Sequence, residues 1–282
     1  MSIDPQALWY INGRWVHPNA ATIPITDVAV LRGYSLFESL RTYNRHPFHL
    51  REHLERLYRS AEHIELVLPF SRDEITDIVQ QVIERNTYQH ASLRILITGG
   101  QSTDGIIPDG LPTLSVLITP LGERDMERFA RGVHLITTHL HREMPEAKTT
   151  SYISAIRALK EAARHDATDA LFVNEHGHVL EGTRSNFFIF LDDLLITPRT
   201  GILLGVTRQV VLELARSHFK VEERPILLEE LSEADEAFIT GSSREITPVV
   251  RIDDRIIGTG QPGPRTYELE QRFIDMVERG DF

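Results

Sequence analysis

The segment EAKTTSYISAIRALKEAARHDATDALFVNEHGHVLEGTRSNFFIF, residues 146–190, decides the fold. Residues 151–165 have the spacing of an amphipathic helix, and residues 170–173, 178–180 and 186–190 read as strands. The apolar residues expected to share the buried face of this helix are Ile153, Ile156, Leu159 and Ala163. Because the strands come in runs with helices between the runs, we expect an α+β fold rather than a regular βαβ alternation.

The sequence on either side of this segment predicts two domains. The elements expected before it are a hairpin at 9–16 with its turn at Asn12-Gly13, helices at 49–66 and 71–85, the second opened by a Ser71–Glu74 capping box, and strands at 93–98, 114–119 and 133–138. The elements expected after it are strands at 194–197 and 237–240 and helices at 205–219 and 266–277. A polar break predicts a linker at 120–125, between a small N-terminal α/β domain at 1–119 and a large C-terminal domain at 126–282 that carries Lys148.

Composition narrows the class of protein. The 282 residues include 41 acidic and 30 basic side chains, a formal charge of −11, which argues against nucleic acid as a partner. There is no cysteine, so disulfides, thiolate metal sites and a cysteine nucleophile are excluded. No stretch of sequence reads as a signal peptide or a membrane span, and we expect no membrane partner and a cytoplasmic location.

Only three of the 30 basic residues are lysines, which limits any chemistry that needs a primary amine. Lys160 lies in the charged stripe of its predicted helix, and Lys220 follows a predicted helix end, so both are expected at the surface. Lys148 differs because it sits in a loop among small and hydroxyl residues, between a strand and a helix. Taken alone, it is still most simply interpreted as an exposed loop lysine.

Glu181 changes that interpretation. It stands between Leu180 and the apolar strand 186–190, so we expect a partly buried carboxylate with a cationic or protonated partner. A lysine that forms a Schiff base and a carboxylate that faces a pyridinium nitrogen are the two fixed points of pyridoxal phosphate catalysis. Lys148 and Glu181 therefore become candidates for those two positions.

Residues 146–190 resemble the signature of the class IV (fold type IV) pyridoxal-phosphate aminotransferases. This family includes branched-chain amino acid aminotransferases, D-amino acid aminotransferases, (R)-amine transaminases and aminodeoxychorismate lyase. The other segments that resemble the family are RGYSLFESLRTY at 32–43, FHLREHLERLYRSA at 48–61, GILLGVTRQVVLELA at 201–215 and FITGSSREITPVV at 238–250. The resemblance implies a two-domain fold type IV enzyme, the cofactor pyridoxal 5'-phosphate, and a homodimer with pockets at the subunit interface.

The resemblance also implies which residues bind the cofactor. Lys148 is the Schiff-base lysine and proton carrier, and Glu181 pairs with the pyridine nitrogen. The residues expected around the cofactor phosphate are Arg56, Val206, Thr207 and Ser242. An independent argument supports part of this set, because Gly205-Val206-Thr207 opens a predicted helix and a helix N-terminus attracts an anion. Tyr152 matches a tyrosine that contacts the phenolic oxygen, though the family places it one position later; packing on the core is the alternative.

Substrate recognition should depend on arginine, the natural bidentate partner of a carboxylate. The resemblance places Phe37 and Arg94 by the substrate side chain, and Ser243 by the substrate carboxylate. Arg32 and Arg184 are alternative carboxylate ligands, and a clamp made by both would favour D-amino acids. The pattern T-R-G of the usual D-amino acid enzymes is absent, because residues 98–100 read Thr-Gly-Gly.

The expected activity is transfer of an amino group between an amino acid and 2-oxoglutarate, with branched-chain L-amino acids favoured. The alternatives left open are a D-amino acid aminotransferase, an (R)-amine transaminase and aminodeoxychorismate lyase, which would use the same lysine for β-elimination. A binding module without catalysis is the remaining possibility. The pair His139 and His141 has no third ligand at suitable spacing, so we interpret both as surface residues and expect no metal site.

Overall fold

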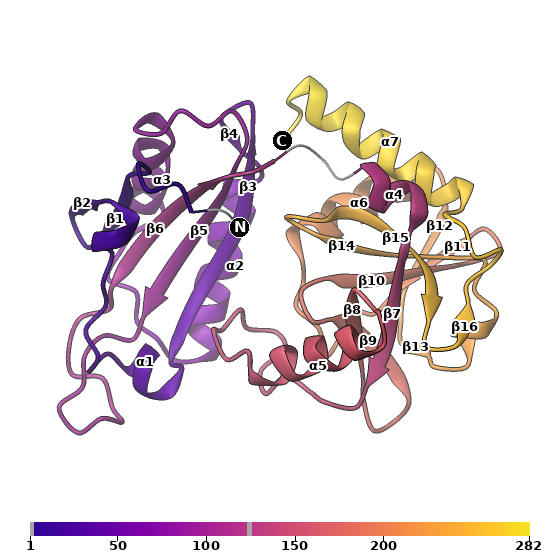
Figure 1. Cartoon of the computed structure of the whole chain (residues 1–282), viewed down its shortest axis with the longest axis horizontal. Helices are drawn as coiled ribbons and strands as arrows, with labels where there is room; N and C mark the ends of the chain where they lie inside the picture. Colours follow the sequence, from indigo (N-terminus) through magenta and orange to yellow (C-terminus); the bar gives the residue numbers. More distant parts are fainter. Residues whose placement is uncertain (1–2, 123–125) are drawn as a thin grey trace. The chain divides into compact units, whose positions relative to one another are not determined.

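The computed structural model describes residues 3–122 and 126–282, and the chain groups into two compact units (Figure 1). The first unit is Met1–Glu123 with Ala147–Ser151, and the second is Arg124–Glu146 with Tyr152–Phe282. Each unit combines helices with a largely antiparallel sheet, which confirms the predicted α+β class. Among the described residues, no helix has both the length and the apolar composition needed to span a membrane.

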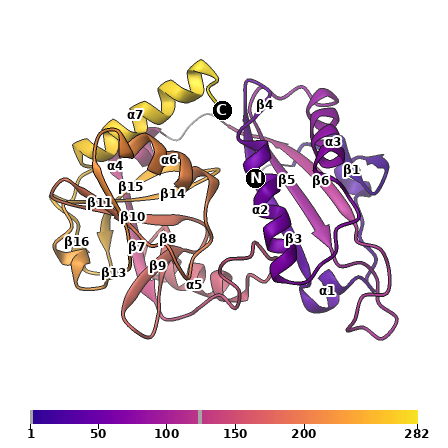
Figure 2. The same ribbon diagram turned by 180° about the vertical axis from the view of Figure 1, so that it is seen from behind.

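The first unit contains a six-stranded antiparallel sheet within residues 3–122, in the order β2-β1-β6-β5-β3-β4. Its strands are β1 (Trp9–Ile11), β2 (Arg14–Val16), β3 (Ser35–Tyr43), β4 (His46–Pro47), β5 (Ala91–Thr98) and β6 (Leu114–Pro120). Its helices are η1 (Pro18–Ala20), α1 (Val28–Arg32), α2 (Leu50–His63) and α3 (Arg72–Glu84). The helices α2 and α3 cover the same face of the sheet, and Figure 2 shows the molecule from the side on which these helices lie. The hydrophobic core lies between the helices and the strands.

Local sequence signals account for several of these elements. Asn12 and Gly13 both have positive φ, as the predicted tight turn between β1 and β2 requires. Ser71 and Glu74 form the predicted capping box, in which each side chain accepts a hydrogen bond from the other residue's backbone N–H. Both predictions are confirmed.

The second unit contains a ten-stranded sheet within residues 126–282. Its strands are β7 (Val133–Thr138), β8 (Asp169–Val173), β9 (His178–Gly182), β10 (Asn186–Leu191), β11 (Leu194–Thr197), β12 (Lys220–Glu223), β13 (Ile226–Leu227), β14 (Glu236–Gly241), β15 (Glu245–Ile252) and β16 (Arg255–Ile256). Its helices are α4 (Met126–Arg131), α5 (Ile153–Arg164), α6 (Val206–Arg216), η2 (Glu230–Ser232) and α7 (Pro264–Arg279).

Six of these strands close into a barrel in the order β10-β14-β15-β7-β8-β9, because β9 pairs again with β10. Side chains that alternate along the strands, such as Leu171, Phe187 and Ile239, fill its interior. The closing pair joins Glu181 to Asn186, so the barrel closes at the glutamate that the sequence singled out.

The predicted buried face of α5 is wrong. Ala155, Ala158 and Ala162 are buried against β7 and β8, whereas Ile153 is 74% exposed and Ile156 is 51% exposed. Alanine lets the helix backbone approach the sheet closely, and the larger isoleucines then point outward. The spacing of the large apolar residues was the misleading signal.

The predicted linker at 120–125 lies partly outside the described residues, since 123–125 are not described. Pro120 still belongs to β6. The stretch Ala147–Ser151 groups with the first unit, because Thr149 bridges to Leu36 in β3. Lys148 is thereby held by β3, whereas the sequence assigned it to the C-terminal domain. The domain boundaries themselves stay a prediction.

Candidate active site

Lys148 is anchored on the first unit by its backbone. Its N–H donates to Oγ of Ser60 on α2 at 3.1 Å, and its carbonyl accepts the N–H of Phe37 on β3 at 3.0 Å. Its Nζ lies 4.6 Å from the centroid of the Phe37 ring. The structure describes all three lysines, and Lys148 alone is half-buried, while Lys160 and Lys220 are exposed as expected.

The Phe37 ring lies close to both this lysine and Arg94. The Arg94 guanidinium is 5.3 Å from the centroid of the same Phe37 ring, although Arg94 itself is exposed on β5. The structure thus brings together three predicted site residues within the first unit: Lys148, Phe37 and Arg94. Arg32 is exposed on α1, where its Nη1 donates to the Leu31 carbonyl at 2.9 Å, and no described contact joins it to these three.

Arg56 is buried on α2 in an ion pair with Glu38 of β3. Its Nε donates to Oε1 at 2.9 Å and its Nη2 to Oε2 at 2.7 Å, while Nδ1 of His53 lies 2.7 Å from Oε2. Burial opposes ionisation of Glu38, but the charge of Arg56 and the hydrogen bonds from Arg56 and His53 outweigh it. The pKa of Glu38 therefore lies far below its ordinary value of 4.5.

At His53 burial outweighs the neighbouring anion, so this side chain is held in its neutral form, whereas Glu38 is held in its charged form. Burial lowers the pKa of His53 below the ordinary 6.5, Glu38 opposes the shift, and the charges of Arg56 and Lys148 add to it. A neutral His53 donates from Nδ1 to Glu38, which leaves Nε2 as a buried acceptor without a partner among the described residues. The cluster of Glu38, His53 and Arg56 thus carries no net charge, and its buried carboxylate fixes the guanidinium of Arg56 in place.

The sequence interpretation gave no role to Glu38 or His53. A signal was present, because a carboxylate inside an apolar strand needs a buried cationic partner. His53 and Arg56 are three residues apart on one helix and so share a face. What the sequence lacked was the pairing of that face with β3.

Glu181 lies at the end of β9 in the second unit and is 4% exposed. Its Oε1 accepts Nη1 of Arg142 at 2.5 Å, and its Oε2 accepts the N–H of Leu203 at 3.0 Å and Nδ2 of Asn186 at 3.5 Å. The expected burial with a cationic partner is confirmed. Arg142 was missed, because it stands 39 residues away in a loop with no pattern of its own.

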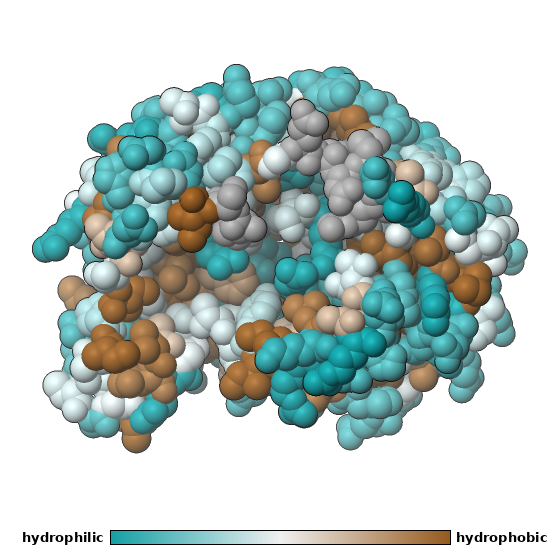
Figure 3. All heavy atoms as spheres, in the orientation of Figure 1, coloured by the Kyte–Doolittle hydropathy of each residue, from teal (hydrophilic) through white to brown (hydrophobic). Residues whose placement is uncertain are grey.

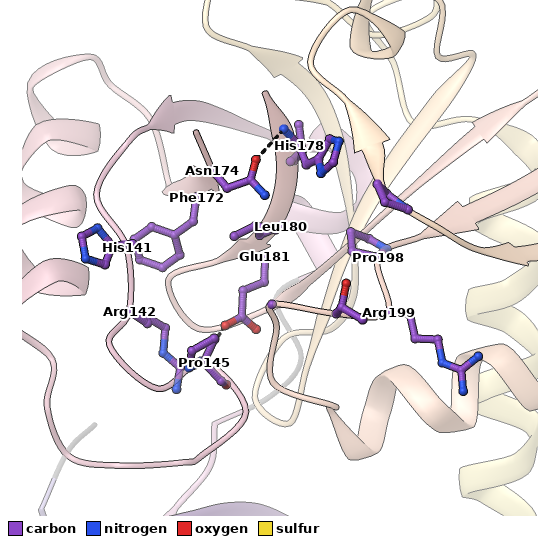
Figure 4. A pocket seen from close by; sticks show the side chains of 14 residues that line it. His141, Arg142, Pro145, Phe172, Asn174, His178, Leu180, Glu181, Pro198 and Arg199 are labelled. Atoms are coloured by element: carbon purple, nitrogen blue, oxygen red, sulfur yellow. Dashed lines mark hydrogen bonds and ion pairs between the residues drawn. The ribbon is translucent and has the colours of Figure 1, made fainter. Parts of the chain in front are cut away.

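A cavity of about 220 Å³ opens beside this ion pair in the second unit (Figure 4). Arg142, Pro145, Phe172 and Leu180 line it together with Glu181, whereas the guanidinium of Arg199 points away from it. None of the other predicted site residues lines this cavity.

The start of α6 can bind an anion. Its first residues are Val206 and Thr207, its N-cap Gly205 has no side chain to bond the first N–H groups, and its first turn has no acidic residue. Gly205 is required there, since a Cβ would lie 2.1 Å from Oδ1 of Asn186. The same Asn186 donates to the Leu203 carbonyl at 2.7 Å, which fixes the loop before the helix.

Ser242 and Ser243 lie in the turn between β14 and β15, the first half-buried and the second exposed. Arg184, exposed in the turn between β9 and β10, lies close by, because its carbonyl would be 3.2 Å from a Cβ placed on Gly241. Tyr152, also in the second unit, is half-buried and packs against the cluster under α5. Packing thus accounts for Tyr152 by itself, and its role toward a cofactor stays a prediction.

The comparisons with known proteins identify the class. The family model described as "Amino-transferase class IV" matches residues 35–252. The chain belongs to the class IV aminotransferases, and it is an enzyme of the transaminase class.

Curated relatives are similar over nearly the whole chain. A putative branched-chain-amino-acid aminotransferase of Methanocaldococcus jannaschii is 33% identical over 95% of this chain and 95% of its own. A branched-chain-amino-acid aminotransferase of Pseudomonas aeruginosa is 33% identical over 96% of this chain and 92% of its own. A D-alanine aminotransferase of Listeria monocytogenes is 31% identical over 95% and 96%.

Solved structures agree with this fold. A branched-chain amino acid aminotransferase with pyridoxamine 5'-phosphate, from the source abbreviated T.th., has a TM-score of 0.92 at 29% identity, over 98% of this chain and 95% of that one. The branched-chain amino acid aminotransferase of Escherichia coli has a TM-score of 0.91 at 30% identity, over 96% and 94%. The predicted fold type IV architecture is confirmed.

Proposed function

We propose that this chain is a pyridoxal-phosphate-dependent aminotransferase that moves an amino group between an amino acid and 2-oxoglutarate, with branched-chain L-amino acids favoured. The observation that carries the proposal is Lys148, the one half-buried amine among the three lysines, held against Phe37. Two of the curated relatives above are named for branched-chain amino acids, and one solved relative is described with pyridoxamine 5'-phosphate.

The donor set of the chain fits this cofactor. A phosphate needs cations and free N–H groups, which Arg56 and the uncapped start of α6 at Val206 and Thr207 offer, and Ser242 adds a hydroxyl. A pyridine nitrogen needs a buried anion, which Glu181 offers. We propose these residues, with Lys148 and Tyr152, as the cofactor-binding set.

Pyridoxal 5'-phosphate, when bound, supplies an aldehyde that captures the amino group and a ring that accepts electrons from the α-carbon. Lys148 would hold the aldehyde of the cofactor through Nζ, and, once the amino group of the donor has displaced it, the freed Nζ would be the base that carries the α-proton. Glu181, which Arg142 holds in an ion pair, would face the ring nitrogen and keep it protonated. Phe37 would exclude water from one side of the amine.

For the substrate we propose that Arg94 and Phe37 bind the side-chain end, because the Phe37 ring contacts Lys148 and the Arg94 guanidinium contacts the same ring. Ser243 would contact the substrate carboxylate. A D-amino acid aminotransferase is the second candidate, supported by the relative named D-alanine aminotransferase. In that case Arg32 and Arg184, both exposed, would bind the carboxylate.

We also propose a homodimer and a cytoplasmic location. Exposed apolar side chains gather on the first unit, at α1 and in the loop that follows β5. Together they form the hydrophobic area at the lower left of Figure 3. These residues are Val30, Leu31, Ile106, Ile107 and Leu111. Apolar patches of this kind mark association surfaces. Light scattering of the purified protein should give twice the 32.2 kDa of one chain.

The activity is tested by mixing the purified, cofactor-loaded protein with one amino donor at a time and following the absorbance of the bound cofactor. L-Leucine should change the spectrum, whereas D-alanine, D-glutamate and (R)-1-phenylethylamine should leave it unchanged. A change with the D-amino acids or the (R)-amine alone would replace the branched-chain assignment. Release of pyruvate from aminodeoxychorismate without 2-oxoglutarate would indicate the lyase. Lys148→Ala should abolish every such reaction, and the matched surface variant Lys160→Ala should not.

A further inference from the structure

A buried ion pair lies at one end of the barrel, outside the set of residues proposed to touch the cofactor or the substrate. Nη1 of Arg244 is 3.2 Å from Oδ2 of Asp169, and their side chains are 8% and 0% exposed. Asp169 begins β8, and Arg244 lies in the turn between β14 and β15, directly after Ser242 and Ser243. Removing one partner of such a pair would leave a charge buried without compensation.

The second oxygen of Asp169 bonds a different turn. Oδ1 accepts the hydroxyl of Thr183 at 2.5 Å, the N–H of Thr183 at 3.3 Å and the N–H of Ala170 at 2.9 Å. Thr183 lies between Glu181 and Arg184. One carboxylate therefore joins the turn 182–185 to the turn 241–244.

The two turns also contact each other directly, so their positions are coupled. A Cβ on Gly241 would lie 3.2 Å from the Arg184 carbonyl oxygen and 4.0 Å from Cα of Ser185. Within each turn the backbone is closed by its own hydrogen bond, Gly182 N–H to Ser185 at 2.7 Å and Arg244 N–H to Gly241 at 3.0 Å. A shift of either turn would move the other.

We propose that Asp169 and Arg244 are positioning residues that hold these two turns together, and so place Ser242 and Ser243 for the cofactor phosphate and the substrate carboxylate. The inference rests on the proposed function, since it assigns ligands to those serines. It adds a specific claim: affinity for both anionic groups depends on an ion pair that touches neither.

Two conservative variants separate this role from a purely structural one. Asp169→Asn keeps an oxygen that can accept from Thr183 and removes only the charge, and Arg244→Met removes the guanidinium while keeping a long side chain. Arg244→Lys retains the charge and should restore part of the function. Glu236→Gln is the matched control, because Glu236 is likewise buried and accepts from Arg265, from the hydroxyl of Thr266 and from backbone N–H groups, but at the start of α7.

The experiment measures three quantities in each variant: the Kd of the apoprotein for pyridoxal 5'-phosphate, the split between KM and kcat for the amino donor, and backbone hydrogen exchange of the apoprotein at 182–185 and 241–245. Asp169→Asn and Arg244→Met should raise Kd and KM by about tenfold, the equivalent of one lost polar contact. The change in kcat should stay within about twofold, because these residues do not act on the reacting atoms. Exchange should accelerate in both turns, and Glu236→Gln should lower the thermal midpoint without any of these effects.

Unchanged Kd, KM and exchange in both ion-pair variants, with only a lower thermal midpoint, would overturn the inference while leaving the proposed function intact. Faster exchange confined to one turn would also overturn it, because the two turns would then be independent. If the parent protein binds no pyridoxal 5'-phosphate, the proposed function fails, and the exchange measurement still decides whether the ion pair couples the two turns.

Discussion

Two buried glutamates, each paired with an arginine, behave differently in the two units. Glu38 has both oxygens bonded to the side chains of Arg56 and His53 and is fully inaccessible. Glu181 accepts a hydrogen bond from the guanidinium of Arg142 and others from the neutral donors Leu203 N–H and Asn186 Nδ2, and it borders a cavity. The comparison teaches that burial with a cation is not by itself a sign of catalysis: Glu38 holds an arginine in place, whereas Glu181 keeps an anion beside open space.

The largest effect on stability should follow from Glu38→Gln. This substitution leaves buried Arg56 without its anion, so we expect the free energy of unfolding to fall by about 3–5 kcal/mol. Urea unfolding measures it, with Glu55→Gln on the exposed side of α2 as the control, which should stay within about 0.5 kcal/mol. Equal losses in the two variants would mean that the Glu38 cluster is not an anchor.

Glu181→Gln should show the reverse pattern. The amide cannot stabilise a protonated ring nitrogen, so we expect kcat to fall by about 10²-fold or more, comparable to losing one preorganised electrostatic contact. The loss of stability should be smaller than for Glu38→Gln, since Arg142 lies at a cavity. The kcat from steady-state kinetics and the free energy of unfolding in urea are measured for Glu181→Gln and for the control Glu175→Gln, which lies in the exposed turn before β9. Retained kcat in Glu181→Gln would remove the distinction between the two glutamates.

A smaller effect concerns pH. The pKa of His53 is lowered in the folded chain, so as the pH falls through its ordinary value of 6.5 the unfolded chain binds the proton first. The stability contributed by neutral His53 is present above pH 6.5 and is lost below it, with a slope approaching about 1.4 kcal/mol per pH unit. Glu38 stays ionised over this range because its pKa is strongly lowered.

The test of this pH effect is the free energy of unfolding between about pH 7.5 and 5.5, an interval that brackets the ordinary histidine pKa, measured by urea unfolding. His53→Gln should flatten that dependence relative to the parent. His63→Gln, an exposed change on the same helix, should not. A parent whose stability is independent of pH over this interval would contradict a neutral His53.

Local signals predicted the parts of the fold that depend on neighbours in sequence. The Asn12-Gly13 turn and the Ser71–Glu74 capping box need only two to four residues, and both are present. The long strands β3 and β15 were not predicted, because both faces of each are largely buried and their residues do not alternate.

The candidate site divides in the same way. Lys148 and Glu181 stand out in the sequence for two reasons. Lys148 is one of only three lysines and sits in a loop among small and hydroxyl residues, and Glu181 is a carboxylate next to an apolar strand, where charged side chains are unusual. Arg142 and His53 acquire their roles only through contacts across 39 and 15 positions of sequence, which no local pattern contains. The exposed Ile153 shows the converse error, in which a correct periodicity was assigned to the wrong face.

The central claim is that Lys148 carries the cofactor. The most direct measurement is borohydride reduction of the purified protein loaded with pyridoxal 5'-phosphate, followed by proteolysis and mass spectrometry of the labelled peptide. We expect a single phosphopyridoxyl group on Lys148, with Lys160 and Lys220 unlabelled. A protein that takes up no label, or takes it up on either of the two exposed lysines, would contradict the account.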